Sequence, residues 1–388
     1  MTTANIDLPI YMDYQATTPL DPRVLDAMMP FLTEKFGNPH SNTHKFGWEA
    51  MDAIDRARGQ IAALIGAQAE EIVFTSGATE SNNLAIKGLG RAYAEHRDHI
   101  VTIETEHKCV LESVASMERE GYSVTVLPVG PDGLIDMDKL SQSITDRTLL
   151  VSVMAVNNEI GVIQPLADIG ALCRERKVFF HTDGAQAVGK IPLDVEAMKI
   201  DLMSLTGHKV YGPKGAGALY LRKKSRARPE PLLSGGGQED GLRSGTLAPA
   251  LCVGLGEACA IAEEEYEREA ERLREFFDRF VAGVQSALPT VVLNGHREQR
   301  IPGNISLSFP GVRSDRLLAS MRDLAVSSGS ACVSESDESS YVLKAIGVTG
   351  ELAEASIRFG IGRFTTSAEI DYAIDALITK VSELREAA

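Results

Sequence analysis

The sequence predicts an α/β fold in which helices wrap a mostly parallel sheet, followed by a smaller α+β part. Strand-like apolar runs alternate with helical patterns from about residue 50 to 260, which is typical of βαβ units. One run, LLVSVMAV, is apolar throughout, as expected of a strand covered on both faces. After residue 247 the alternation stops, and a helical pattern rich in Glu and Arg extends to about residue 287.

The elements can be assigned in chain order. The expected strands of the large part are EIVF (71–74), HIVTIE (99–104), SVTVLPV, LLVSVMAV, KVFFHTD and DLMSLTGHK, and YGPKGAGALYL indicates a Gly-rich turn into a hairpin. A helix follows SGATESNN, and another helix extends to about residue 120. In the smaller part we expect strands at 304–309 and 356–361, and helices around 314–323, 338–346 and 367–386. A chain of 388 residues has enough apolar sequence for two domains, which we place at 16–262 and at 1–15 with 263–388.

Composition excludes several classes of protein. The formal charge of −15 disfavours direct binding of nucleic acid or of anionic membranes. The start, MTTANIDLPIYMDYQ, has no basic segment followed by an apolar run, and no apolar stretch has the length of a membrane span. Five widely scattered cysteines indicate reduced thiols, and they lack the spacing of zinc ligands. We therefore expect a cytoplasmic protein without a structural metal.

SGATESNN (76–83) joins a strand to a helix and has the features of an anion site. Ser76, Gly77 and Ala78 are small enough for a ligand to approach the backbone, and Thr79 adds a hydroxyl beside free helical N–H groups. Ser and Thr also cap helices where no ligand binds, so the segment alone leaves both interpretations open.

HTDGAQ (181–186) and SLTGHK (204–209) each follow an apolar run and should lie at the carboxyl edge of the sheet, where open α/β sheets bind ligands. A buried Asp183, a buried Lys209 and a phosphate site suggest pyridoxal phosphate (PLP), with the lysine as Schiff-base partner and the aspartate at the pyridine nitrogen. An ordinary Asp–Lys ion pair is the alternative, and Lys214 is the rival lysine. His107, past another strand end, could stack on the cofactor ring.

SSGSACVSESDESS (327–340) places a thiol, Cys332, on a polar loop. A cysteine is usually buried as a small hydrophobic residue, and this segment offers little in which to bury it. Exposure therefore indicates a reactive thiol.

Together these segments resemble the class I cysteine desulfurases, the group of the IscS, NifS and mitochondrial enzymes. SGATESNN, TEHK, VNNEIGV, HTDGAQAVGK, TGHK, YGPKG, RSGT and SSGSAC occur in the family's order, and the likeness runs from PIYMDYQATTPLDPR to IRFGIGRFTT. It implies a PLP-dependent transferase of fold type I, with a seven-stranded sheet in the large domain. It also implies that L-cysteine becomes L-alanine while its sulfur passes to the Cys332 thiolate as a persulfide.

The resemblance also implies residue roles. Lys209 carries PLP and moves the substrate proton, while Asp183 holds the pyridine nitrogen and Gln186 the ring oxygen. His107 stacks on the ring and takes the proton of the substrate thiol. The phosphate is bound beside Ala78 by Thr79, Thr206 and His208, and Thr246 reaches the PLP of the partner subunit in an obligate homodimer. Arg358 binds the substrate carboxylate with help from Asn158.

The resemblance further implies a sulfur acceptor, an IscU- or NifU-like iron–sulfur scaffold protein or a tRNA thiolation system, and Cys332 could transiently ligate a cluster with such a partner. The location would be the bacterial cytoplasm, or the mitochondrial matrix for an organelle homologue.

The sequence departs from the family pattern in three places. VSESDESSYVL lacks a proline and adds Glu335 and Asp337, Gly184 replaces a common alanine, and the chain ends at LREAA, without the tail expected to dock the scaffold. Two other interpretations remain: another PLP reaction on the same fold, such as an aminotransferase or a lyase, and a non-enzymatic protein in which Cys332 ligates a metal.

Overall fold

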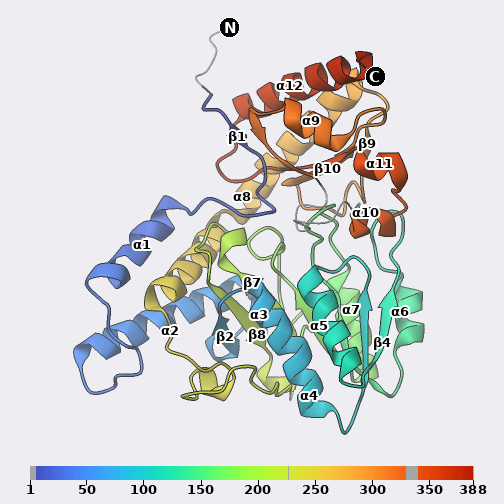
Figure 1. Cartoon of the computed structure of the whole chain (residues 1–388). Coiled ribbons are helices and arrows are strands. Elements are labelled where there is room, and N and C mark those ends of the chain that lie inside the picture. Colours follow the sequence, from blue (N-terminus) through green and yellow to red (C-terminus); the bar gives the residue numbers. More distant parts are fainter. Residues whose placement is uncertain (1–5, 226, 329–339, 388) are drawn as a thin grey trace.

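The computed structural model describes residues 6–225, 227–328 and 340–387, and its centre is a seven-stranded sheet. The strand order is β2-β8-β7-β6-β5-β3-β4, and helices lie on both sides of the sheet (Figure 1). The strands are β2 (Ile72–Thr75), β3 (His99–Ile103), β4 (Ser123–Leu127), β5 (Thr148–Ser152), β6 (Phe179–Asp183), β7 (Leu202–Thr206) and β8 (Gly217–Leu221).

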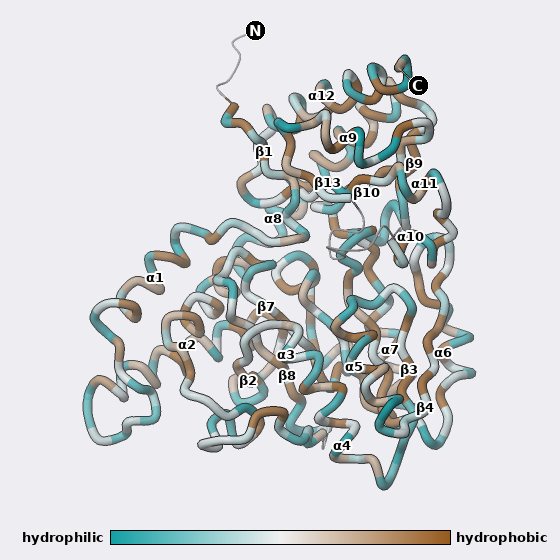
Figure 2. Tube along the Cα trace, in the orientation of Figure 1, coloured by the Kyte–Doolittle hydropathy of each residue, from teal (hydrophilic) through white to brown (hydrophobic). Residues whose placement is uncertain are grey.

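The predicted mostly parallel sheet is confirmed. The pairs β3–β4, β3–β5, β5–β6 and β6–β7 are parallel, and only β8 runs antiparallel to its neighbours β2 and β7. All residues of β2, β3, β5, β7 and β8 are buried, as expected of strands with helices on both faces. In Figure 2 the hydrophobic segments gather along this sheet. The run LLVSVMAV is strand only to Ser152, and two of its last four residues, Met154 and Val156, line a cavity at the end of the strand.

The helices of this part follow the strands in the expected alternation. They are α1 (Pro22–Thr33), α2 (Lys45–Ile65), α3 (Ala78–Asn83), α4 (Leu89–Tyr93), α5 (Lys108–Arg119), α6 (Met137–Ser143) and α7 (Leu166–Arg176). A π-helical segment (Leu84–Gly88) joins α3 to α4 without a break. The sequence patterns did not predict α1 and most of α2. α1 and its connection to α2 project from the side of the molecule (Figure 1).

The smaller part contains an antiparallel sheet of order β12-β13-β10-β9 and a two-stranded parallel pair, β1-β11. Its strands are β1 (Ile10–Tyr11), β9 (Val292–Leu293), β10 (Asn304–Ser308), β11 (Leu324–Ala325), β12 (Ser327–Ser328) and β13 (Ser356–Gly360). Its helices are α9 (Ser314–Ser320), α10 (Tyr341–Ala345), α11 (Gly350–Glu354) and α12 (Ser367–Glu386). The predicted strands and helices are present, with ends shifted by a few residues.

The long helix α8 (Pro249–Ala287) joins the two parts. Its first half supplies Leu255 and Cys259 to the core beneath the large sheet, whereas Phe277 and Phe280 pack in the core of the smaller part. The division into domains at residue 262 stays a prediction, because one continuous helix belongs to both cores.

The predicted polar loop 327–340 is shorter than expected. Ser327 and Ser328 form β12, which pairs with β13, and Ser340 caps α10 by accepting the Leu343 N–H. Short strands of this kind have no apolar alternation, so the sequence pattern does not reveal them. Cys332, Glu335 and Asp337 lie outside the described residues.

Candidate functional site

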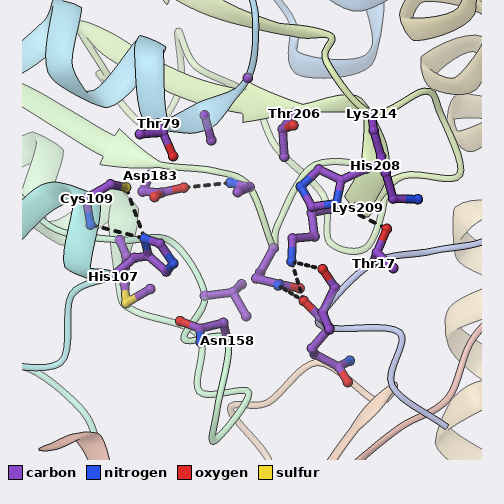
Figure 3. A pocket seen from close by; sticks show the side chains of 18 of the residues that line it. Thr17, Thr79, His107, Cys109, Asn158, Asp183, Thr206, His208, Lys209 and Lys214 are labelled. Carbon is purple, nitrogen blue, oxygen red and sulfur yellow. Dashed lines mark hydrogen bonds between the residues drawn. The ribbon is translucent and has the colours of Figure 1, made fainter. Parts of the chain in front are cut away.

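A cavity of about 600 Å³ lies at the carboxyl edge of the large sheet (Figure 3). Ten residues to which the sequence resemblance assigns a role line it: Ala78, Thr79, His107, Asn158, Asp183, Gln186, Thr206, His208, Lys209 and Arg358. Parallel neighbours explain the convergence, since Asp183 ends β6, Thr206 ends β7 and Lys209 follows in the next turn. Thr246 is exposed and lies outside this cavity, and Cys332 lies outside the described residues.

Asp183 is buried and held by two donors. The Asn82 side-chain nitrogen donates to Asp183 Oδ2 at 2.7 Å, and the backbone N–H of Ala185 donates to Oδ1 at 2.9 Å. The alternative interpretation, an ordinary Asp183–Lys209 ion pair, is not supported, because no such pair is among the salt bridges of the described residues. Asn82 was not predicted. Its place in α3, one helical turn after Ala78, could have pointed to it, because residues four apart share a face of the helix.

Lys209 reaches across the cavity to the N-terminal segment. Its Nζ donates to the carbonyl oxygens of Gln15 and of Ala16, the second at 2.7 Å (Figure 3). Gln186 Nε2 also donates to the Gln15 carbonyl, at 2.8 Å. Sequence analysis gave residues 15 and 16 no role, because main-chain acceptors carry no residue signature. The rival, Lys214, is exposed and lines the same cavity from a turn.

One end of the cavity is suited to an anion. Ala78 and Thr79 open α3 after Gly77, whose φ of 152° is one that glycine adopts readily. A Cβ on Gly217 would lie 2.4 Å from the Gly77 Cα, so the strand and the helix start touch through glycine. His208 shares a 3.2 Å hydrogen bond with Thr17, and burial, reinforced by nearby lysines, lowers its pKa to about 4. His208 is therefore neutral at pH 7.

Arg358 lies at the other end of the cavity on β13 and is nearly fully buried. Its Nη2 pairs with Asp13 Oδ1 at 2.7 Å, and its Nη1 donates to the Asn158 carbonyl at 3.0 Å. Arg358 Nε is buried and has no partner among the described residues. A buried, unpartnered guanidinium nitrogen in a cavity wall is a binding position for an anionic oxygen. Asp13 was not predicted.

His107 caps α5 and contributes its ring to the cavity. Its Nδ1 accepts the Cys109 backbone N–H at 3.2 Å, and Cys109 Sγ lies 3.0 Å from the same nitrogen. Burial lowers the pKa of His107, while the nearby Asp183 carboxylate acts to raise it. At neutral pH the ring is therefore mainly uncharged.

The lysine, the aspartate and the anion end are the components that a PLP enzyme requires, and comparison with known proteins identifies the family. The family model of aminotransferase class-V matches residues 10–373. The chain belongs to this family. It is 59% identical to the cysteine desulfurase IscS of Rickettsia bellii over 98% of the chain and 93% of the relative, and 58% identical to that of Rickettsia typhi over the same shares. These relatives place it among the class I cysteine desulfurases.

Solved structures of similar proteins confirm the fold. A NifS-like protein, 34% identical, superimposes with a TM-score of 0.90 and covers 97% of this chain and 100% of its own. A structure described as SspA in complex with cysteine is 39% identical, with a TM-score of 0.82, and covers 92% of this chain and 99% of its own. The prediction of a class I desulfurase of the PLP-dependent fold type I is confirmed.

PLP is the cofactor of this family, and the cavity fits it. Asp183 Oδ2 already has a donor in Asn82, yet Asn82 Oδ1 is buried without a partner among the described residues, so the polar edge there is incompletely satisfied. Lys209 and Asp183 approach the cavity from neighbouring strands, with Thr79, Thr206 and His208 at its anion end. The residues match the aldehyde, pyridine and phosphate groups of the cofactor in number and chemical type.

His181, a buried histidine outside the cavity lining, should make the stability of the fold decrease in acid. His181 is fully buried between Ser152 Oγ at 2.8 Å and Ser204 Oγ at 3.1 Å, and burial lowers its pKa to about 3. Below the ordinary histidine pKa of 6.5 the unfolded chain binds a proton that the folded chain refuses, so stability falls as the pH drops from 6.5 towards 3. In His181→Asn, denaturant midpoints should fall less steeply over this range than in the wild type. An equal fall of the midpoint with pH in the variant and the wild type would show that His181 is not the group responsible.

Proposed function

We propose that this chain converts L-cysteine to L-alanine and stores the sulfur as a persulfide on Cys332. The observation that carries the proposal is that Lys209, Asp183 and Arg358 line one cavity, so a cofactor-binding lysine and a carboxylate-binding arginine face the same space. Incubation of the holoenzyme with L-cysteine and a thiol reductant tests it. L-Alanine with an equal amount of sulfide is expected, whereas pyruvate and ammonia would indicate a lyase instead.

Bound PLP supplies an electron sink for the substrate Cα, and the residues of the chain position and move protons around it. Lys209 would bind the cofactor and, once released by the substrate, remove and return the Cα proton. The Asp183 carboxylate, oriented by Asn82 and the Ala185 N–H, would keep the pyridine nitrogen protonated. The Cys332 thiolate would then attack the substrate sulfur, forming the S–S bond of the persulfide as the C–S bond breaks.

Arg358 would bind the substrate carboxylate. Two of its nitrogens are fixed by Asp13 and by the Asn158 carbonyl, and the unpartnered Nε leaves a donor for the ligand. Because Arg358 is 3% exposed, its orientation is set before the substrate arrives. The Asn158 side chain, whose Oδ1 is buried without a partner among the described residues, lines the cavity beside it.

Removal of Asp13 should destabilise the ligand-free protein and increase the stabilising effect of a carboxylate ligand. Asp13→Ala leaves the buried Arg358 charge without its partner, at a cost of about 3 kcal/mol. We expect the melting temperature of the holoenzyme to fall by about 2–6 °C. Addition of L-alanine should then raise the melting temperature of the variant by more than it raises that of the wild type.

Ser327→Ala is the matched control, because Ser327 Oγ donates to the other Asp13 oxygen at 2.8 Å and its loss removes one hydrogen bond only. A melting temperature of Asp13→Ala equal to that of the wild type, or an L-alanine effect equal to that in the wild type, would show that Asp13 does not compensate Arg358.

The active form would be a homodimer in which Thr246 reaches the partner's PLP. Thr246 is exposed and lies outside its own cavity, beside Ser76 and Gly215 at the anion end. Large exposed apolar side chains gather on α1, on the connection that follows it and on the start of α2, as an interface requires: Leu25, Met29, Leu32, Phe36, Phe46 and Trp48. Light scattering should give twice the chain mass. In a mixed dimer of one Thr246→Ala subunit and one wild-type subunit, the cavity of the variant subunit receives the threonine of the wild-type subunit. That cavity should therefore bind the PLP phosphate with normal affinity.

The sulfur acceptor would be an iron–sulfur scaffold protein of the IscU or NifU type, with tRNA thiolation as a further use, and the location would be the bacterial cytoplasm. The support is the identity of the Rickettsia relatives, which are named cysteine desulfurase IscS. No helix of the described residues is long and apolar enough to cross a membrane. Transfer of labelled sulfur from the persulfide to a purified scaffold protein tests the acceptor, and a transient cluster on Cys332 would appear in the same experiment with iron.

A further inference from the structure

Cys109 provides two contacts to the inner ring nitrogen of His107. The Cys109 backbone N–H donates to His107 Nδ1 at 3.2 Å, and Cys109 Sγ lies 3.0 Å from it. A ring nitrogen that accepts a backbone N–H has its lone pair free of a proton, and a second donor can share that lone pair. The neutral ring must therefore carry its proton on the other nitrogen, Nε2.

The direction of the thiol hydrogen follows from Asn82. Its side-chain nitrogen lies 2.7 Å from Asp183 Oδ2 and 3.1 Å from Cys109 Sγ. A carboxylate only accepts, so the Asn82 NH₂ group must face Asp183, and the same group donates to Sγ. The sulfur thus accepts from Asn82, and its other side-chain hydrogen bond is the one to His107 Nδ1, which receives the S–H. Burial raises the pKa of Cys109 to about 12, which keeps this hydrogen in place at neutral pH.

We propose that Cys109 is a positioning residue that fixes neutral His107 as the Nε2–H tautomer, so that His107 meets the substrate as a hydrogen-bond donor. The outer edge of the ring is turned towards the cavity, away from Cys109 (Figure 3). A substrate sulfur or oxygen at this edge receives a hydrogen bond, whereas Nε2 has no lone pair to take the proton of the substrate thiol. This differs from the role that the sequence resemblance implies for His107, and it rests on the proposed function for the identity of the substrate.

Several charged or titratable groups surround the ring, and they act on the equilibrium between its neutral and charged forms. Asp183 on β6 favours the charged ring, while Lys209 and Lys108 disfavour it, and buried Glu106 precedes the histidine in the chain. Hydrogen bonds donated to Nδ1 act in the same direction as burial, because they stabilise the neutral form. Loss of the Cys109 thiol should therefore raise the pKa of His107.

Nitrogen NMR of the holoenzyme labelled with ¹⁵N-histidine tests the tautomer. The chain has eight histidines, and His107→Gln identifies the signal of interest by its absence. At neutral pH we expect an unprotonated Nδ1 and a protonated Nε2 for His107. A protonated Nδ1 in the major neutral form would overturn the proposal. The readout needs no turnover, so its outcome is independent of whether the chain desulfurates cysteine.

Two variants separate hydrogen bonding from packing. In Cys109→Ala the ring keeps the backbone donor but loses the side-chain donor, and its pKa should rise by about 0.5–1 unit. Cys109→Ser supplies an O–H donor at the same place, and the pKa should return towards the wild-type value. Equal shifts in both variants would indicate a role in packing alone, and no shift in Cys109→Ala would show that the thiol does not act on the ring. Either result overturns the proposal.

Discussion

Replacing Lys209 with alanine is expected to abolish the covalent attachment of PLP and to lower the turnover of L-cysteine by about 10⁴-fold or more. The Lys209 amine is the cavity amine that points at the N-terminal segment, where it donates to the carbonyls of Gln15 and Ala16. A nearby water or a second lysine cannot reproduce its position, so both the attachment and the proton transfer are lost. Borohydride reduction followed by peptide mass spectrometry measures the attachment directly.

Lys214→Ala is the matched control, since Lys214 lines the same cavity but is exposed in a turn. The reduced cofactor should remain on Lys209 in this variant. Recovery of the label on Lys214, in the wild type or in Lys209→Ala with retained turnover, would show that the two lysines have the opposite roles.

Replacing Cys332 with serine should abolish the protein persulfide and reduce the release of L-alanine to about 1% or less of the wild-type rate. An alcohol is a far weaker nucleophile than a thiolate at neutral pH, while the cavity itself stays intact. Binding of L-cysteine, followed by the visible spectrum of the cofactor, should therefore persist in Cys332→Ser.

Cys109→Ser is the control for the other thiol near the substrate, because Cys173, Cys252 and Cys259 are buried in the cores. The persulfide should remain on Cys332 in this variant, whatever its rate of formation. A Cys332→Ser protein that accumulates persulfide at the wild-type rate would exclude Cys332 as the sulfur carrier.

Much of this site could be predicted from the sequence because several of its residues lie at the carboxyl ends of strands. Asp183, Thr206 and Lys209 follow apolar runs, and parallel strands bring their carboxyl ends to one edge of the sheet. The same logic placed Ala78 and Thr79 there. Most strands of the large sheet were likewise visible as apolar runs, since strands buried on both faces need continuous hydrophobic sequence.

The residues that sequence analysis missed act through long-range contacts. Asp13 meets Arg358 from a position 345 residues away in the chain, and the carbonyls of Gln15 and Ala16 meet Lys209 across more than 190 residues. No local pattern encodes such a contact, and a main-chain acceptor has no residue type to recognise. Asn82 and Cys109 were also missed, because their role depends on the distance from α3 and α5 to Asp183, which only the folded chain defines.

In the proposed reaction, sulfur passes from L-cysteine to Cys332 in the cavity that Lys209, Asp183 and Arg358 line. A single turnover with sulfur-labelled L-cysteine, followed by alkylation and peptide mapping, tests it most directly. We expect one labelled sulfur on the peptide that contains Cys332 for each L-alanine formed. Labelled sulfur on Cys109, or L-alanine formed while all the sulfur appears as free sulfide and none on the protein, would contradict it.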